Sequence, residues 1–157
     1  MKRQRGVVLL LALVLSLLLG LLAASALRDA LVETRMAGHL REGLKALEQA
    51  EATLLAGEAQ LQTAPPGLCQ ACLTPAHPHD LQGQWHASAD GFFQLQNLGI
   101  STRALHMPEG DPVTLYRVTA VSRQLESRQV LESIYAIPAA QAQPPRRILW
   151  RQRLREG

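Results

Sequence analysis

The feature that most constrains this chain is an uncharged apolar segment near the N-terminus that runs into a second helical pattern. Residues 7–27 contain no charged side chain. At about 1.5 Å per residue they reach about 31 Å as a helix, which is the thickness of the hydrocarbon core of a bilayer. The apolar segment of a cleaved secretory signal is shorter, at about 7–15 residues. We therefore expect residues 7–27 to be a retained transmembrane helix.

The charges on either side of this segment indicate its orientation. Lys2, Arg3 and Arg5 precede it without a neighbouring acid, whereas Arg28 is followed at once by Asp29. Because positive residues favour the cytoplasmic side, we expect a cytoplasmic N-terminus and an exported remainder. The three N-terminal charges also account for the net charge of +3, since 13 basic and 13 acidic residues remain without them.

A helical pattern continues beyond residue 27. Apolar or small residues recur mostly every three, four or seven positions, and charged residues fill most of the positions between them. The members of this stripe are Leu27, Leu31, Thr34, Leu40, Leu44, Leu47, Ala50, Leu54 and Leu61. The first proline after the stripe is Pro65. The pattern predicts one helix from about Val7 to about Gln62, in which residues 28–62 are the amphipathic continuation.

Residues 63–157 are predicted to form a small head. A proline-rich loop occupies its beginning, and alternating apolar residues then predict strands at 91–98, 113–122, 128–137 and 148–154. The middle pair forms a hairpin, and the last is an arginine-rich edge strand. The expected fold class is α+β, with the second half of the long helix packed on a three- or four-stranded antiparallel sheet.

Four short motifs within about residues 3–58 follow one another in a characteristic order. They are Arg3-Gln4-Arg5-Gly6, Arg35-Met36-Ala37-Gly38, Gln49-Ala50-Glu51-Ala52 and Gly57-Glu58. The first resembles the leader of type IV prepilins, and the four together resemble the PilX family of minor pilins of type IV pili. Beyond them, only a strand-rich head with Tyr116-Arg117-Val118-Thr119-Ala120 fits that family in a general way.

The resemblance implies a pilus subunit that is not an enzyme. Residues 1–6 would be a leader, cut between Gly6 and Val7 by a prepilin peptidase that then methylates the new amine of Val7. It implies no cofactor and no small-molecule substrate. The protein would reside in the bacterial inner membrane with a periplasmic head, and later in a pilus of the kind used for cell adhesion and twitching motility. Expected partners are other minor pilins, the major pilin and a large tip adhesin, with which such subunits help to initiate assembly.

Leu11 departs from the usual pilin pattern, which has a glutamate five residues into the mature chain. In the usual pilin this carboxylate faces the N-terminal amine of a neighbour in apolar surroundings, where an unpaired charge would be costly. PilX-like subunits often lack the acid too. We therefore expect a subunit at or near the pilus tip, with no subunit ahead of it whose amine needs neutralising.

Cys69 and Cys72 are the only cysteines, and His77 and His79 follow them closely. In an exported head, a disulfide in an exposed loop is the favoured interpretation because that compartment is oxidising. Free or redox-active thiols are one alternative. A zinc site is another, although the spacing of the four side chains is unusual for zinc and nearby prolines stiffen the segment. We therefore expect no metal.

The C-terminal residues 146–155 hold five arginines around Trp150. Basic residues interleaved with an aromatic one could bind nucleic acid. The interpretation that we favour is a solvated edge strand whose apolar Ile148, Trp150 and Leu154 pack inward, without a nucleic-acid partner. The remaining histidines, acids and serines lie in no pattern typical of a catalytic or calcium site.

Two other functions fit the same sequence. A pseudopilin of a type II secretion apparatus would share the leader and the fold. A single-span envelope protein with a ligand- or metal-binding head would instead keep its N-terminus, because no processing would occur at Gly6. The mass of the mature N-terminus separates this last function from both kinds of pilin.

Overall fold

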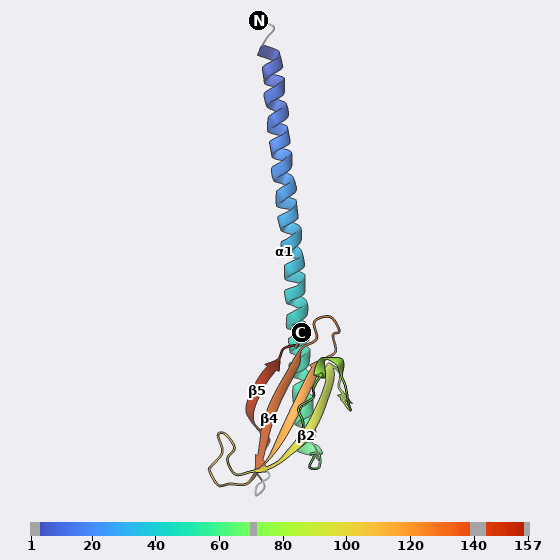
Figure 1. The fold of residues 1–157 in the computed structure, drawn as a ribbon, viewed down its shortest axis with the longest axis vertical. Coiled ribbons are helices and arrows are strands. Elements are labelled where there is room, and N and C mark those ends of the chain that lie inside the picture. The colour runs from blue at the N-terminus through green and yellow to red at the C-terminus, as the bar shows by residue number, and fades with distance from the viewer. Residues whose placement is uncertain (1–3, 70–71, 139–143, 156–157) are drawn as a thin grey trace. The chain divides into compact units, whose positions relative to one another are not determined.

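The structure is a computed structural model that describes residues 4–69, 72–138 and 144–155. The chain divides into two compact units, residues 1–41 and 42–157. In chain order, the elements are the helix α1 (Gln4–Thr63), the 3-10 helix η1 (Pro78–Asp80) and the strands β1 (His86–Ala87), β2 (Gly91–Ser101), β3 (Val113–Ser122), β4 (Val130–Pro138) and β5 (Arg146–Arg153) (Figure 1).

The first unit consists of the N-terminal part of α1. From Gly6 to Arg41 every side chain is exposed within this structure, including the valines and leucines of the apolar segment. The segment includes a stretch with a mean hydropathy of 3.0, so the helix is long and apolar enough to cross a membrane. Apolar surface of this extent is disfavoured in water, and it requires lipid or other apolar surfaces around it.

The second unit contains a five-stranded sheet in which each strand pairs with the next along the chain, in the order β1-β2-β3-β4-β5. All the pairings are antiparallel. The predicted hairpin is β3–β4, in which Tyr116 lies opposite Tyr135 and Val118 opposite Ser133. The α+β fold class and the edge position of β5 are confirmed.

The sheet has one strand more than the three or four predicted. The additional strand, β1, has two residues, which pair with Phe92 and Phe93 of β2. Two residues are too few to show an alternating pattern, so nothing in the sequence marks this strand.

One face of the sheet packs against the C-terminal part of α1. The core joins Leu54 and Leu61 of the helix to apolar side chains of β3 and β4, chiefly Val118 and Tyr135. Packing of the second half of the long helix on the sheet is therefore confirmed.

Of the predicted stripe, Ala50, Leu54 and Leu61 are buried against the sheet, whereas Leu44 is 67% exposed. The small residues Ala46, Thr53 and Gly57, which the stripe did not include, are also buried. The cause is the short distance between helix and sheet, since a Cβ added at Gly57 would lie 2.6 Å from Cγ1 of Val118. Large side chains do not fit at the closest approach.

The inward packing expected for β5 is largely wrong. Ile148 is half-buried, but Trp150 is 45% and Leu154 is 78% exposed. The core is already filled by α1 and the inner strands. Little apolar surface therefore remains to cover the side chains of the edge strand β5.

Candidate functional site

The face of the sheet opposite α1, termed here the outer face, is covered by the loop that follows the helix. This loop, residues 64–85, is called the strap; its residues 70–71 lie outside the described part. The strap begins beside β2, where Leu68 forms a bridge with Asn97. The Nδ2 amide of Asn97 also donates to the carbonyl of Pro66 over 3.1 Å. The strap therefore starts from a fixed point on the sheet.

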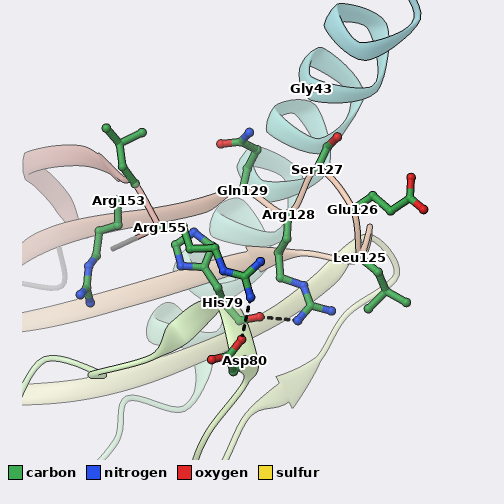
Figure 2. Close-up of a pocket in the computed structure, with 11 residues that line it drawn as sticks. Gly43, His79, Asp80, Leu125, Glu126, Ser127, Arg128, Gln129, Arg153 and Arg155 are labelled. Atoms are coloured by element: carbon green, nitrogen blue, oxygen red, sulfur yellow. Dashed lines mark hydrogen bonds and ion pairs between the residues drawn. The ribbon is translucent and has the colours of Figure 1, made fainter. Parts of the chain in front are cut away.

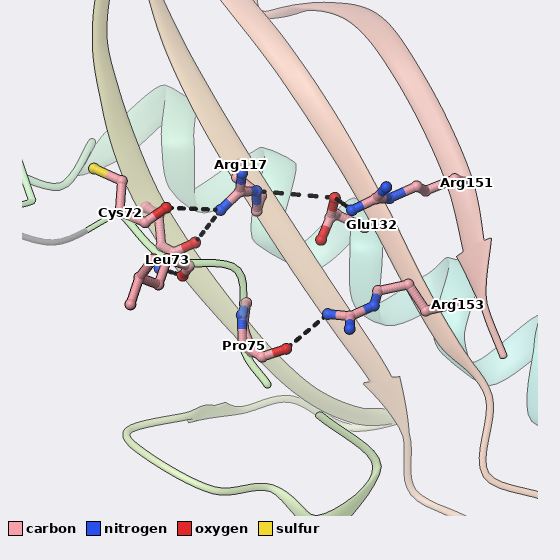
Figure 3. A network of polar contacts seen from close by, with 8 residues as sticks. Cys72, Leu73, Pro75, Arg117, Glu132, Arg151 and Arg153 are labelled. Atoms are coloured by element: carbon pink, nitrogen blue, oxygen red, sulfur yellow. Dashed lines mark hydrogen bonds and ion pairs between the residues drawn. The ribbon is translucent and has the colours of Figure 1, made fainter. Parts of the chain in front are cut away.

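Polar side chains on the outer face hold the strap by its backbone carbonyls. Arg117 on β3 donates to the carbonyl of Cys72 over 3.3 Å, and Arg153 on β5 donates to that of Pro75 over 2.7 Å. Arg128, which precedes β4, donates to the carbonyl of His79. Figure 3 shows the first two of these contacts, on strands that lie on either side of β4. A carbonyl covered by a loop needs a donor in place of water, and the guanidinium groups supply it.

Two glutamines on β2 add to this set. The Nε2 amide of Gln96 donates to the carbonyl of Leu73 over 2.9 Å, and that of Gln94 donates to the carbonyl of Gln84 over 3.1 Å. The side chain of Gln96 also accepts from Arg117 over 3.0 Å. Strands β2, β3 and β5 therefore each contribute an anchor.

Glu132 is the buried charge beneath the strap. Its side chain is 1% exposed, and its Oε1 atom lies 2.6 Å from Nη2 of Arg151 and 3.8 Å from Nε of Arg117 (Figure 3). Glu132 and Arg151 are cross-strand partners in the sheet. This carboxylate forms ion pairs with two arginines at once, and it holds the guanidinium of Arg117 where that group can reach the strap.

Cys69 and Cys72 lie in the strap and are joined as a disulfide, with their Cα atoms 5.6 Å apart. The structure places His77 and His79 further along, on either side of the start of η1. Among the described residues, no three histidine, cysteine, aspartate or glutamate side chains are grouped so as to hold a metal ion.

The predicted processing and family-motif residues lie on α1. Gly6 and Val7 are in the first unit, and residues 1–3 of the leader lie outside the described part. Arg35, Met36, Ala37 and Gly38 are exposed on the same helix. These residues belong to the first unit, whereas the outer face and the cysteines belong to the second.

Two further residues singled out by motif or by type are buried against the sheet. Gly57 of the fourth motif lies at the closest approach of helix and sheet. Ser133 is fully buried on the face that packs against α1, so its hydroxyl cannot reach a substrate. Next to it, burial first and then the Glu58 carboxylate raise the pKa of Tyr135, which keeps its phenol protonated. The contacts around these residues serve packing.

The anchors of the strap were missed by sequence reasoning, which treated the C-terminal arginines as solvated and assigned no contact to Arg117 or Arg128. The available signal was a pair of opposite charges in otherwise apolar strands, namely Arg117 in β3 and Glu132 in β4. Charges in such positions are rarely buried unless they are paired. That rule could have identified the pair, although not the carbonyls that the arginines bind.

Comparisons of this chain with models of protein families, with curated proteins and with solved structures find no match.

Proposed function

We propose that this protein is a non-catalytic minor pilin subunit that helps to initiate assembly of a type IV pilus, at or near its tip. The observation that carries the proposal is α1 itself. Its apolar first part exposes every described side chain from Gly6 to Arg41, while its second part packs on an antiparallel sheet. A helix built in this way needs apolar partners for one part and carries a folded head on the other.

The apolar part of α1 suits a subunit that passes from a membrane into a bundle of helices. Leu9, Leu13 and Leu17 are all more than half exposed, so they are available first to lipid and then to neighbouring helices. Because lipid tails and leucine side chains are similarly apolar, the free energy of transfer between the two environments is small. A small difference allows the subunit to be extracted from the inner membrane without a large barrier.

The head suits a structural subunit. Its outer face is closed by the strap, and the arginines there are engaged with backbone carbonyls and with Glu132. In this proposal the head recognises other minor pilins, the major pilin and a large tip adhesin by its surface. Prepilin peptidase acts only on the N-terminus.

The experiment that tests the proposal is a mass measurement of the mature N-terminus. The full-length protein, purified from membranes of a host with an active prepilin peptidase, should begin at a methylated Val7. The same protein from a host without the peptidase, and a Gly6→Leu variant, should keep Met1 or Lys2. An intact N-terminus in the first sample would instead favour a single-span envelope protein. A type II secretion pseudopilin would also be processed, and it is distinguished by the apparatus with which the protein co-purifies.

Placement at the tip rests on Leu11, where a carboxylate is expected for subunits within the filament. A Leu11→Glu variant could neutralise the amine of a subunit ahead of it, so it should be incorporated along the filament as well as at its end. Gold labelling of an epitope on the head would locate both proteins. If the distributions of wild type and variant were identical, the argument from Leu11 would fail.

A further inference from the structure

A cavity of about 500 Å³ opens between the later part of the β3–β4 connection, η1 and the end of β5. Arg128 lines it from the β3–β4 connection, and Arg153 and Arg155 line it from the end of β5 (Figure 2). Among the described residues of its lining, Asp80 and Glu126 are the acids. These described residues set three guanidinium groups against two carboxylates, which leaves one positive charge in excess. The volume lies within the range of about 300–1,000 Å³ that is usual for ligand sites.

The arginines have donors left for a ligand. A guanidinium carries five N–H donors. Among the described contacts, Arg153 uses one for the carbonyl of Pro75, and Arg155 uses one for Oδ1 of Asp80 over 3.2 Å. Figure 2 shows Arg155 and Arg128 beside Asp80 and His79, with the two partners on one η1 segment. The contact between Arg155 and Asp80 is itself a carboxylate bound to this arginine cluster.

The lining residue His79 provides a second observation on the charge of the site. Burial first, and then the charges of Arg155, Arg153 and Arg128, hold the pKa of His79 below its usual value, although Asp80 acts in the opposite direction. At His79, the charges of the arginines therefore outweigh that of Asp80. A positive potential attracts an anion.

Two large apolar side chains lie among the polar residues of the cavity lining. Leu125 and Leu154 are 77% and 78% exposed, and both line the opening. Large apolar side chains beside a charged pocket suit a polypeptide that offers an acidic side chain between apolar ones, since arginine with apolar neighbours is common at the centre of protein interfaces. The single excess charge matches one carboxylate better than it matches a doubly charged phosphate.

We propose that this cavity is a docking site for a partner polypeptide, which inserts one aspartate or glutamate carboxylate between Arg128 and Arg155 and places apolar side chains on Leu125 and Leu154. The proposal concerns the head alone, so it does not depend on the pilus function. In the free protein Asp80 competes with the incoming carboxylate for Arg155. Removing that competitor should strengthen binding, and removing Arg155 should weaken it.

The test uses the full-length protein in non-ionic detergent and the ¹H–¹⁵N signals of its arginine side chains. The probes are acetyl-Leu-Glu-Leu-amide, the matched acetyl-Leu-Gln-Leu-amide and inorganic phosphate. We expect the glutamate peptide to shift the signals of Arg128 and Arg155 in a saturable way, with an affinity about fivefold or more above that of the glutamine peptide, as befits charge-assisted hydrogen bonds.

Variants separate binding from folding. Arg155→Gln should weaken binding of the glutamate peptide about fivefold, and Asp80→Asn should strengthen it, because the latter frees Arg155. Arg146→Gln, at the other end of β5, is the matched control and should leave the affinity unchanged. Opposite effects of two substitutions on the same ion pair cannot both arise from misfolding. Equal binding of the two peptides, tighter binding of phosphate than of the glutamate peptide, or weakening by both Arg155→Gln and Asp80→Asn would overturn the proposal.

Discussion

At the scale of single residues, the closeness of helix and sheet is set by positions without a side chain. A Cβ at Gly57 would lie 2.6 Å from Cγ1 of Val118 and 3.3 Å from the ring of Phe93. A Cβ at Gly91 would lie 2.0 Å from the carbonyl oxygen of Val121. The Val121 carbonyl is backbone of the neighbouring strand, so Gly91 sets how closely β2 and β3 approach, whereas Gly57 sets how closely the helix approaches the sheet.

Gly57→Ala should therefore destabilise the head even though alanine is the better helix former. The substitution gains about 1 kcal/mol of helix propensity but forces overpacking, which costs about 1–3 kcal/mol, so we expect a net loss of up to about 2 kcal/mol. Gly43→Ala is the matched control, because no atom lies within 4 Å of its added Cβ, and it should be neutral or stabilising. Chemical denaturation of both variants measures the difference. Equal stability of the two would show that the helix can move away from the sheet freely.

His79 makes the stability of the folded protein depend on pH. Its pKa is lowered in the folded protein by burial and by Arg155, Arg153 and Arg128, so the unfolded chain takes up its proton at a higher pH. Stability linked to His79 is therefore complete above the unfolded pKa of about 6.5 and decreases as the pH falls towards the folded value. Thermal melts across this range should show a shallower acid loss for His79→Gln than for wild type. Asp80→Asn should show a steeper one, because Asp80 opposes the shift.

At the scale of elements, the strap and the outer face depend on one buried carboxylate. Glu132→Gln leaves Arg117 and Arg151 without their counter-charge, and breaking a buried pair in this way costs about 3–5 kcal/mol. We expect about 3 kcal/mol, because the side chain of Arg151 is half exposed and Arg117 keeps two other acceptors. Arg151→Gln should cost less, since Arg117 still faces Glu132. Denaturation of both single variants and of the double variant yields the coupling energy. A coupling near zero would mean that the pair does not support the strap.

The helix and the central strands could be predicted from sequence because each has an apolar period of its own. The hairpin of β3 and β4 followed from alternation, and α1 followed from an uninterrupted helical pattern that ends before Pro65. The contacts of the strap could not be predicted, since Arg117, Arg128 and Arg153 bind backbone carbonyls. Every residue has such a carbonyl, so the sequence does not mark which one an arginine binds. The burial of the small residues Ala46, Thr53 and Gly57 beside the predicted leucines has a similar cause. Hydrophobicity alone does not report how closely two elements approach.

At the scale of the whole molecule, the two units have separate requirements. Every buried residue described in the chain lies within residues 42–157, and the first of them is Ala46. The first unit exposes its apolar side chains along its described length. Folding of the head should therefore not require the first unit, whereas the solubility of the full chain is limited by it.

A protein of residues 42–157, exported to an oxidising compartment, should accordingly be soluble without detergent and unfold in one cooperative transition, because the small-residue face of α1 and the sheet remain together in it. A shorter protein of residues 55–157 lacks Ala46, Ala50, Thr53 and Leu54, and with them much of the helix surface that covers the sheet. It should aggregate or melt without cooperativity. Size-exclusion chromatography and circular dichroism compare the two, with the full chain in detergent as the reference for the melting temperature. If 42–157 failed to fold while the full chain folded, the head would depend on the first unit, and the prediction that the head folds by itself would be wrong.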